Sequence, residues 1–382
     1  MANATYAKGL EGVVAGESGI CLIDGERGRL YYRGYSIEDL AARSSFEEVV
    51  YLLLFGKLPT KYVFDEFSTR MRASRALHPK VVQMIRNFPE GGKPMELLQS
   101  VMAYLSGYVE HRIEHSSTCN CRQTLHQVAQ LATVAATYHR FKQGLDYLEP
   151  RADLSHGANF LYMLRGREPD PDEGSIMDAC FVLHAEHGFN ASTFTARVVA
   201  STLSTCYCSI AAAIGALYGA LHGGANEKVF DMLESIGSVD KVEAWVGKAF
   251  EEAQKIMGMG HRIYRTKDPR SKVMEGFLEE LSEKTGRREH VAMLRRIEEL
   301  ATPKFESKDK KIYPNVDYYS GSVYYLLGIP KYLFVPIFAI SRVPGWLAHI
   351  LEQREGGNRI FRPDSAYTGP EARAYAPIEE RG

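Results

Sequence analysis

The sequence predicts a predominantly α-helical protein with one small β-hairpin near its N-terminus. Helical periodicity of apolar residues, punctuated by Pro, Gly and Ser, runs through most of the 382 residues. Strand-like alternation is confined to residues 18–34. The composition, 45% hydrophobic and 24% charged, is that of a globular domain. The length allows two domains or one large domain with a substantial core.

The first expected elements are a hairpin and a short helix. Residues 18–34 alternate apolar and polar side chains around Asp24-Gly25 and Gly28, a pattern typical of a hairpin turn. Ser36 then stands where an N-cap is needed. After this point strands almost vanish from the pattern.

Capping and periodicity predict the remaining helices. Residues 44–48 have a capping-box arrangement before the apolar run Val49–Phe55, which ends at Gly56. The charged run 303–311 breaks the periodicity and is expected to be an exposed loop, with its lysines in solvent rather than beside a nucleotide phosphate. We expect further helices at residues 60–76, 79–87, 94–109, 122–142, 175–187, 192–203, 207–219, 227–236, 240–257, 270–285, 289–301, 319–327 and 331–354.

Two segments stand out by composition. Small residues dominate 205–220, which suits a helix buried in the core or at a subunit interface. After Gly356 the chain becomes irregular, so this arm is either frayed or laid on another surface. Its aromatic residues Phe361, Tyr367 and Tyr375 favour the second alternative.

Charge and cysteine content narrow the class of protein. The net charge of −1 provides no overall field for nucleic acid or an anionic membrane, so any anion site must be local. Six cysteines, including two Cys-x-Cys pairs, favour reduced thiols in a cytoplasm. The N-terminus lacks the pattern of a signal peptide, and apolar runs such as 331–340 fall short of the ~20 residues that cross a bilayer.

Residues 257–270, MGMGHRIYRTKDPR, combine two glycines, a histidine and several cations. Gly258 and Gly260 can adopt backbone angles closed to other residues, and His261 can donate or accept a proton near neutral pH. Arg270 directly follows a proline and suits a planar fork aimed at a carboxylate. The alternative is a glycine C-cap followed by a solvated basic helix. The spacing does not fit a dinucleotide-binding fingerprint.

Two more windows carry residues suited to proton transfer. In LHGGANE at 221–227, His222 precedes a glycine pair and Asn226, which we expect to begin a helix whose dipole favours the neutral imidazole. In YPNVDYYSG at 313–321, Asp317 lies among aromatic residues, where partial desolvation raises the proton affinity of a carboxylate.

Together, LHGGANEKV, MGMGHRIYRTKDPR and YPNVDYYSG resemble the citrate synthase family, and the similarity extends from GLEGV at 9–13 to RIFRPDSAYTG at 359–369. The resemblance implies a helical homodimer that condenses acetyl-CoA with oxaloacetate, with no metal and no permanently bound cofactor beyond the CoA thioester co-substrate. It also implies a large domain at 1–220 and 323–382, and a small domain at 221–322 that closes over the substrates.

The same resemblance implies roles for individual residues. Asp317 would be the base that forms the enolate, His222 the neutral donor to the thioester oxygen, and His261 the group that polarises the ketone. Oxaloacetate would be held by His187, Arg270, Arg342 and Arg362, the last acting across the dimer. CoA would contact Arg265, one helical turn after His261, and Ile256, Met257, Gly258, Met259 and Gly260.

Metal binding is the alternative at two places. His184 and His187 stand at helical spacing, but the nearby sequence offers no set that completes a tetrahedral site. His111, His115, Cys119 and Cys121 could converge, although Cys-x-Cys is tighter than structural zinc spacing and the resemblance is weakest across 111–150. A helix end with buried thiols is the competing interpretation.

Other functions also stay open. A 2-methylcitrate synthase using propionyl-CoA differs by a pocket one methylene larger, worth only ~1–3 kcal/mol of discrimination. A non-catalytic CoA-binding helical module would need no base such as Asp317. A cysteine-dependent acyltransferase would need a basic, exposed thiol, whereas Cys180, Cys206 and Cys208 lie in apolar runs. The chain is short beside the family's NADH-regulated hexamers, so we expect a dimer without NADH control.

Overall fold

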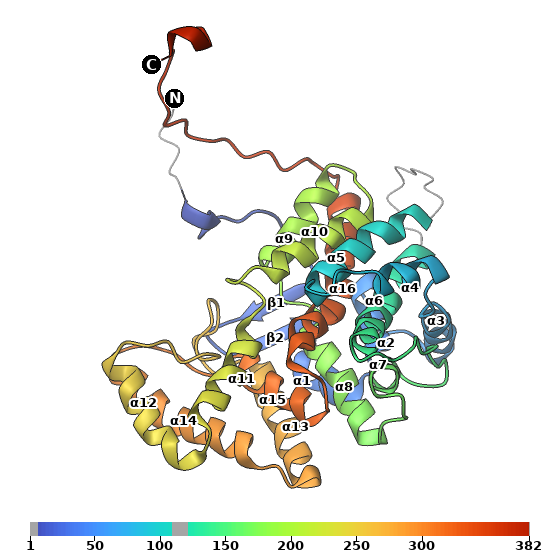
Figure 1. Cartoon of the computed structure of the whole chain (residues 1–382), viewed down its shortest axis with the longest axis vertical. Coiled ribbons are helices and arrows are strands. Elements are labelled where there is room, and N and C mark those ends of the chain that lie inside the picture. The colour runs from blue at the N-terminus through green and yellow to red at the C-terminus, as the bar shows by residue number, and fades with distance from the viewer. Residues whose placement is uncertain (1–6, 109–120, 382) are drawn as a thin grey trace.

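Helices form nearly all of the regular structure in the computed structural model, which describes residues 7–108 and 121–381 (Figure 1). The predicted fold class is therefore confirmed. Ten α-helices of the described residues lie between the sheet and Gly219, and together with the sheet they surround the long helix α16 (Figure 1). Helices α11 to α15 form a second group, which lies to one side of the first (Figure 1).

The predicted hairpin is the first part of a three-stranded antiparallel sheet. Strand β1 (Cys21–Asp24) pairs with β2 (Arg29–Tyr32), and β2 pairs with the two-residue strand β3 (Tyr35–Ser36). The turn between β1 and β2 lies against a distant loop, because a Cβ on Gly25 would stand 2.3 Å from the carbonyl oxygen of Ile263. The hairpin thus supports the loop that carries His261.

The predicted helix starts are confirmed at two serines. The Ser36 side chain accepts a hydrogen bond from the Asp39 amide, and that of Ser45 accepts one from the Glu48 amide. Each serine satisfies a backbone donor that has no partner inside the helix. The helices of the first group are α1 (Ile37–Arg43), α2 (Phe46–Phe55), α3 (Lys61–Ala73), α4 (Pro79–Arg86), α5 (Pro94–Leu105), α6 (Cys121–Lys142), α7 (His156–Arg165), α8 (Pro171–His184), α9 (Ala191–Ser201) and α10 (Cys206–Tyr218).

The second group begins after the His222 window. It consists of α11 (Ala225–Ile236), α12 (Val242–Glu251), α13 (Pro269–Thr285), α14 (Glu289–Glu306) and α15 (Asp317–Leu326), and α16 (Phe334–Glu355) returns to the first group. Short 3₁₀ turns are η1 (Lys8–Leu10), η2 (Ser106–Tyr108), η3 (Val239–Lys241), η4 (Lys331–Leu333) and η5 (Ile378–Glu380).

Several predicted boundaries are wrong. The periodicity at 240–257 overshoots, because α12 ends at Glu251 and the chain then turns toward the glycines at 258 and 260. The loop expected at 303–311 is partly helical, since α14 continues through Pro303 to Glu306. A proline removes one backbone donor, and here the helix tolerates that loss.

The interval between α6 and α9 also differs from expectation. Helix α7 has no counterpart among the predicted helices, although Ser155 caps it by accepting from the Ala158 amide. Helix α8 starts at Pro171, earlier than the expected 175, because Asp170 and Glu173 form a capping box, and it ends at His184 rather than at 187. Because α8 ends at His184, His187 lies in the following loop and not on a face of the helix.

Helix α16 forms the centre of the core. Trp346 is fully buried, and Arg342 on the same helix is only 2% exposed. In the described residues, Lys331–Glu355 is the one helical segment long and apolar enough to cross a membrane, but 94% of its most apolar window is buried inside the protein. The segment is accordingly placed as a core helix.

The arm after Gly356 leaves the body of the molecule and extends beyond it (Figure 1). Tyr367 is 74% exposed and Tyr375 is 83% exposed. Only the start of the arm packs on the body, where Phe361 meets the ring of Phe194 at 5.4 Å between centroids. The aromatic residues farther out do not cover a surface of their own chain, and contact with another surface stays a prediction.

Candidate active site

The segment 256–260 is a loop held against residues 313–315. The backbone amide of Asn315 donates to the Gly258 carbonyl at 2.9 Å, and the backbone amide of Gly260 donates to the Tyr313 carbonyl at 2.8 Å. Gly258 and Gly260 have φ angles of +75° and +91°, in the region that glycine adopts and other residues avoid, as the sequence predicted. A Cβ on Gly258 would also lie 2.6 Å from Val229. This clamp brings the His261 loop next to the start of α15.

His261 to Lys267 do not form a helix, so the basic-helix alternative is wrong. The expectation that Arg265 lies one helical turn after His261 is wrong for the same reason. The backbone amide of Arg265 instead donates to the Gly25 carbonyl at 2.9 Å, while its side chain is exposed. The loop is therefore held by a hydrogen bond to the β1–β2 turn and not by hydrogen bonds of a helix.

His261 is arranged as a neutral hydrogen-bond donor. Its Nδ1 accepts from the amides of Ile263 at 3.1 Å and Tyr264 at 3.3 Å, so the proton of the neutral ring lies on Nε2. Burial and, secondarily, the charge of Arg270 lower the pKa of His261 from 6.5 to about 4. The ring therefore brings a donor without a full positive charge.

His222 has the complementary tautomer. Its Nε2 accepts from the Ser192 amide at 3.3 Å and lies 2.9 Å from the Ser192 hydroxyl, which leaves the proton on Nδ1. Burial and, after it, the charge of Arg342 lower the pKa of His222 to about 4. Asn226 does not begin the following helix, however, because α11 starts at Ala225 after Gly224.

Asp317 is the first residue of α15. Its Oδ1 is buried without a hydrogen-bond partner among the described residues, and its backbone amide donates to Oδ1 of Asn315 at 3.0 Å. Desolvation raises the pKa of Asp317 to about 6, although the charges of Arg270 and Arg342 oppose this shift. The expected increase in proton affinity is thus present, with desolvation as its main cause.

Two buried arginines link these groups. Beyond the larger effect of burial, Arg342 lowers the pKa of His222, and Arg270 lowers that of His261. Both arginines also lower the pKa of His187 and of Asp317. Such electrostatic influence requires proximity, so the three windows and His187 converge around the two guanidinium groups. His187 also lies beside His261, with 5.2 Å between ring centroids.

The two arginines differ in their partners. Arg270 donates from Nε and Nη2 to the two oxygens of Asp268, at 3.1 and 2.7 Å. The carboxylate fork predicted for Arg270 is therefore made within the chain. Arg342 donates from Nε to the His184 carbonyl at 2.6 Å. Among the described residues no carboxylate forms an ion pair with Arg342 within 4.0 Å.

The structure does not bring Arg362 to this site, because that residue is exposed on the C-terminal arm. Its role remains a prediction about a second subunit. Ile256 and Met259 are buried at 2% and 5% exposure, and Met257 is partly exposed. Of this segment, Met257 takes part in the lining of a pocket.

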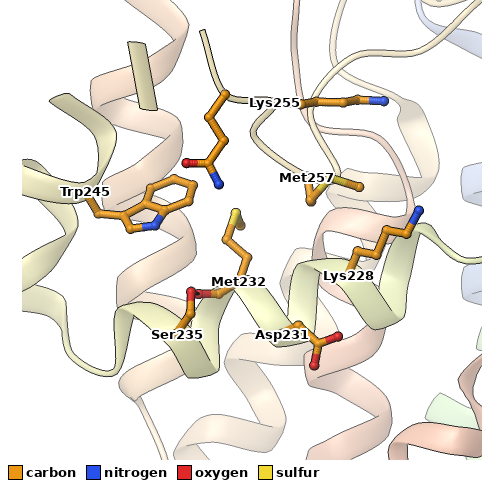
Figure 2. Close-up of a pocket in the computed structure, with 8 residues that line it drawn as sticks. Lys228, Asp231, Met232, Ser235, Trp245, Lys255 and Met257 are labelled. Carbon is orange, nitrogen blue, oxygen red and sulfur yellow. Dashed lines mark hydrogen bonds between the residues drawn. The ribbon is translucent and has the colours of Figure 1, made fainter. Parts of the chain in front are cut away.

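The pocket has a volume of about 310 Å³ and lies between α11, Trp245 of α12 and the end of the 252–257 loop (Figure 2). Met232 and the Trp245 ring provide apolar surface, and Lys228 and Lys255 provide positive charge. The remaining lining residues are Asp231, Ser235, Gln254 and Met257. The lining thus combines apolar surface with two lysines and one carboxylate.

Sequence reasoning missed the residues that hold the site together. Tyr264 links two of its histidines, because its hydroxyl lies 3.3 Å from His187 Nε2 while its amide donates to His261. Ser192 orients His222, and the Trp346 indole donates to the Ser192 hydroxyl at 3.3 Å. Two more supports, Asp268 and Asn315, stood inside the quoted motifs, but nothing in the motifs marked them as partners.

The alternative sites receive little support. Within residues 7–108 and 121–381, no group of three or more His, Cys, Asp or Glu side chains is arranged to hold a metal ion. His184 contacts the Tyr324 hydroxyl at 2.8 Å, whereas His187 contacts Tyr264. Burial raises the pKa of the Cys180 thiol well above its usual value. The other proposed metal cluster cannot be placed, since His111, His115 and Cys119 lie outside the described residues, as does the side chain of Cys121.

A carboxylate with a raised pKa, two imidazoles with lowered pKa values and two buried arginines occur together in a helical protein, a set of groups typical of an enzyme site. The model of the family described as "Citrate synthase, C-terminal domain" matches residues 9–364. A citrate synthase of Deinococcus radiodurans is 44% identical over 99% of this chain and 100% of the relative. The chain belongs to the citrate synthase family.

A second relative and two solved structures show the range of the similarity. A 2-methylcitrate synthase of Corynebacterium glutamicum is 39% identical over 100% of both chains. The crystal structure of citrate synthase from Pyrobaculum aerophilum has a TM-score of 0.92 at 43% identity, covering 98% of this chain and 95% of its own. The ternary complex of Thermoplasma acidophilum citrate synthase with carboxymethyl coenzyme A and oxaloacetate has a TM-score of 0.91 at 33% identity, covering 98% of this chain and 99% of its own.

Proposed function

We propose that this enzyme makes citrate from acetyl-CoA and oxaloacetate with Asp317 as the base, His222 as the donor to the thioester oxygen and His261 as the donor to the ketone. The observation that carries the proposal is the set of protonation states. The Asp317 pKa is raised to about 6, while those of both histidines are lowered to about 4. At neutral pH the carboxylate is ionised and both rings are neutral.

These states suit the chemistry of enolisation. A carbon acid beside a thioester loses its proton only if the developing enolate oxygen is stabilised at the same time. Nδ1 of His222 carries the donor for that oxygen, since Nε2 is occupied by Ser192. Asp317 Oδ1, which is buried and makes no hydrogen bond within the described part of the chain, is the atom suited to accept the proton. Hydrolysis of citryl-CoA then releases CoA.

Nε2 of His261 carries the donor for the oxaloacetate ketone, because Nδ1 accepts from two backbone amides. Arg270, Arg342 and His187 are proposed to hold the dianionic substrate, supported by their common burial. The partner subunit's Arg362 is proposed to complete the set. The exposed arm, which extends away from the body, supports that assignment (Figure 1).

CoA is proposed to bind along Ile256, Met257, Gly258, Met259 and Gly260, with the Arg265 side chain beside a phosphate. The exposure of Arg265 and the pocket next to Met257 support this placement (Figure 2). No permanently bound cofactor is needed, because the CoA thioester itself carries the acyl group.

We also propose the division into a large domain at 1–220 and 323–382 and a small domain at 221–322. Packing of α11 and α13 on α15, and of α12 on α14, supports a separate small body. A cytoplasmic homodimer in the tricarboxylic acid cycle is the expected setting.

A thiol-release assay with oxaloacetate, comparing acetyl-CoA and propionyl-CoA, tests the function. A higher kcat/KM for acetyl-CoA is expected, and a preference for propionyl-CoA would make the enzyme a 2-methylcitrate synthase. Asp317→Ala should nearly abolish turnover and leave oxaloacetate binding largely intact. Equal turnover in this variant would exclude Asp317 as the base.

Mixing two inactive proteins tests the role of Arg362. Asp317→Ala and Arg362→Ala homodimers should each have little activity, and unfolding and refolding them together should restore part of it in hybrid dimers. The hybrid contains one site with both residues intact only if Arg362 acts across the dimer. Absence of restored activity, with hybrids detected by mass, would place Arg362 in its own subunit's site or outside either site.

A further inference from the structure

A buried carboxylate stands directly beside the substrate-binding residues and has no role in the chemistry described above. Glu186, which precedes His187, is fully buried. Its Oε1 accepts from the Gly188 amide and lies 3.0 Å from His349 Nε2, while its Oε2 is buried with no hydrogen-bond partner in the described residues. A buried carboxylate with an unsatisfied oxygen is costly and requires an explanation.

His349 does not neutralise this carboxylate. Nη1 of Arg197 lies 3.1 Å from Nδ1 of His349, and a guanidinium can only donate. Nδ1 must therefore accept, so the ring proton lies on Nε2 and is donated to Glu186. With its ring proton on Nε2, His349 offers Glu186 a hydrogen bond and leaves Oε2 without a partner in the described residues.

Arg342 lies three residues before Gly345, which packs against Glu186, and is therefore a buried cation close to this carboxylate. Burial lowers the pKa of Arg342, and the charge of Glu186 is the largest influence that opposes this shift. No ion pair within 4.0 Å joins the two in the described structure, whereas Arg270 is paired directly with Asp268. One buried arginine of the site thus has a contacting counter-ion, and the other has one held at a distance.

Glu186 fits against helix α16 at a glycine, Gly345. Arg342, Gly345 and His349 are three and four residues apart, so they lie on one face of the helix. A Cβ on Gly345 would stand 2.3 Å from Glu186 Oε2. The glycine admits the carboxylate between the helix and the loop after α8, and the imidazole of His349 and the Gly188 amide hold its other oxygen.

We propose that Glu186 is a specificity-determining residue that offsets the charge of Arg342 without occupying its Nη groups. The Nη groups of Arg342 remain available to a carboxylate of oxaloacetate. The negative charge of Glu186 also weakens the binding of citrate, the more highly charged product. This inference rests on the proposed function. Citrate carries one more negative charge than oxaloacetate, so removal of the Glu186 charge strengthens citrate binding more than oxaloacetate binding.

The test is Glu186→Gln in the full-length dimer, which keeps the shape of the side chain and one oxygen that can accept from the Gly188 amide and from His349. Dissociation constants for citrate and oxaloacetate are measured by calorimetry. We expect citrate to bind roughly tenfold more tightly and oxaloacetate to change less, with product inhibition by citrate increased to match. The gain should shrink as sodium chloride is raised.

The sign of the effect separates charge balance from a purely structural role. Loss of a structural support would loosen the His187 loop and weaken the binding of both anions. Unchanged or weaker citrate binding overturns the inference. Glu352→Gln is the matched control, because Glu352 pairs with Arg197 at 2.8 Å in the same network and forms no ion pair with Arg342 in the described structure. Its citrate affinity should equal that of the wild type.

Two further results complete the test. If Glu186→Gln does not fold, the double variant Glu186→Gln with His349→Gln makes the same charge change with two amides that can bond to each other, and the same tightening is expected. If the wild type forms citrate and the variants show no tightening, only the role of Glu186 fails. If the wild type neither forms nor binds citrate, the proposed function fails with it.

Discussion

The side chain of Asn315 joins the loop of one catalytic candidate to the helix of another. Its Nδ2 donates to the Gly260 carbonyl at 2.8 Å, and its Oδ1 accepts from the Asp317 amide at 3.0 Å. His261 follows Gly260 directly, so this side-chain amide, together with the backbone hydrogen bonds of the clamp, positions the proposed ketone donor relative to the proposed base. Removing this link should disturb the chemistry more than the stability.

Asn315→Ala is expected to lower kcat by about 10- to 100-fold with a smaller change in KM, because displacement of reacting groups by about 1 Å costs this much. Steady-state kinetics in both substrates measure the effect. Asn87→Ala is the matched control, since Asn87 is exposed at the end of α4 and far from these contacts in the sequence. A kcat equal to that of the wild type would show that the link does not position the pair.

The pH dependence of kcat/KM for acetyl-CoA should reflect Asp317. The base works only when ionised, and its pKa is raised to about 6, so activity should fall with unit slope below about pH 6 and reach a plateau above it. His222 and His261 have pKa values of about 4 and remain neutral on that plateau. A profile that stays flat from pH 7 to pH 5 would contradict the assignment of the base.

Gly258→Ala should destabilise the protein by about 1–3 kcal/mol from backbone strain alone. The φ angle of Gly258 is +75°, and the new Cβ would lie 2.9 Å from the Tyr318 Cα. Gly247→Ala provides the comparison, because Gly247 lies inside α12 and its added Cβ would meet no atom of the described neighbours within 4 Å. That change should stabilise the protein by about 0.5–1 kcal/mol. Urea unfolding measures both variants, and equal effects would refute the steric argument.

His156→Leu should stabilise the protein by about 1–3 kcal/mol at pH 7.5, because both ring nitrogens of His156 are buried without partners in the described part of the chain. The stability advantage of His156→Leu over the wild type should increase as the pH is lowered. Burial holds the folded-state pKa of His156 well below 6.5, so the unfolded chain takes up the proton first and wild-type stability falls as pH drops below about 6.5.

The control for this change is His139→Leu, which removes the 2.6 Å contact between His139 Nδ1 and the Tyr332 hydroxyl and should destabilise the protein. Urea unfolding at about pH 7.5 and about pH 5.5, on either side of the unfolded-state pKa, measures both variants. A stability advantage of His156→Leu that does not increase at the lower pH would argue against the protonation account.

Local signals predicted much of the fold. Ser36 and Ser45 begin helices because a serine oxygen can satisfy backbone donors within the same few residues. Gly258 and Gly260 have the positive φ angles expected of them. The failures concern helix α7, which was not predicted, and several boundaries, because α12 ends at Glu251 rather than at 257 and α14 passes through Pro303.

The sequence by itself determined the helical fold class, the family and the chemical types at the site, because side-chain identity and short-range capping are properties of adjacent residues. Only the tertiary structure decided which atoms face which. The tautomers of His222 and His261, and the packing of Glu186 against Gly345, depend on how the loops and helices pack around them. Hydrogen-bond geometry and desolvation arise from that packing, and no local pattern encodes them.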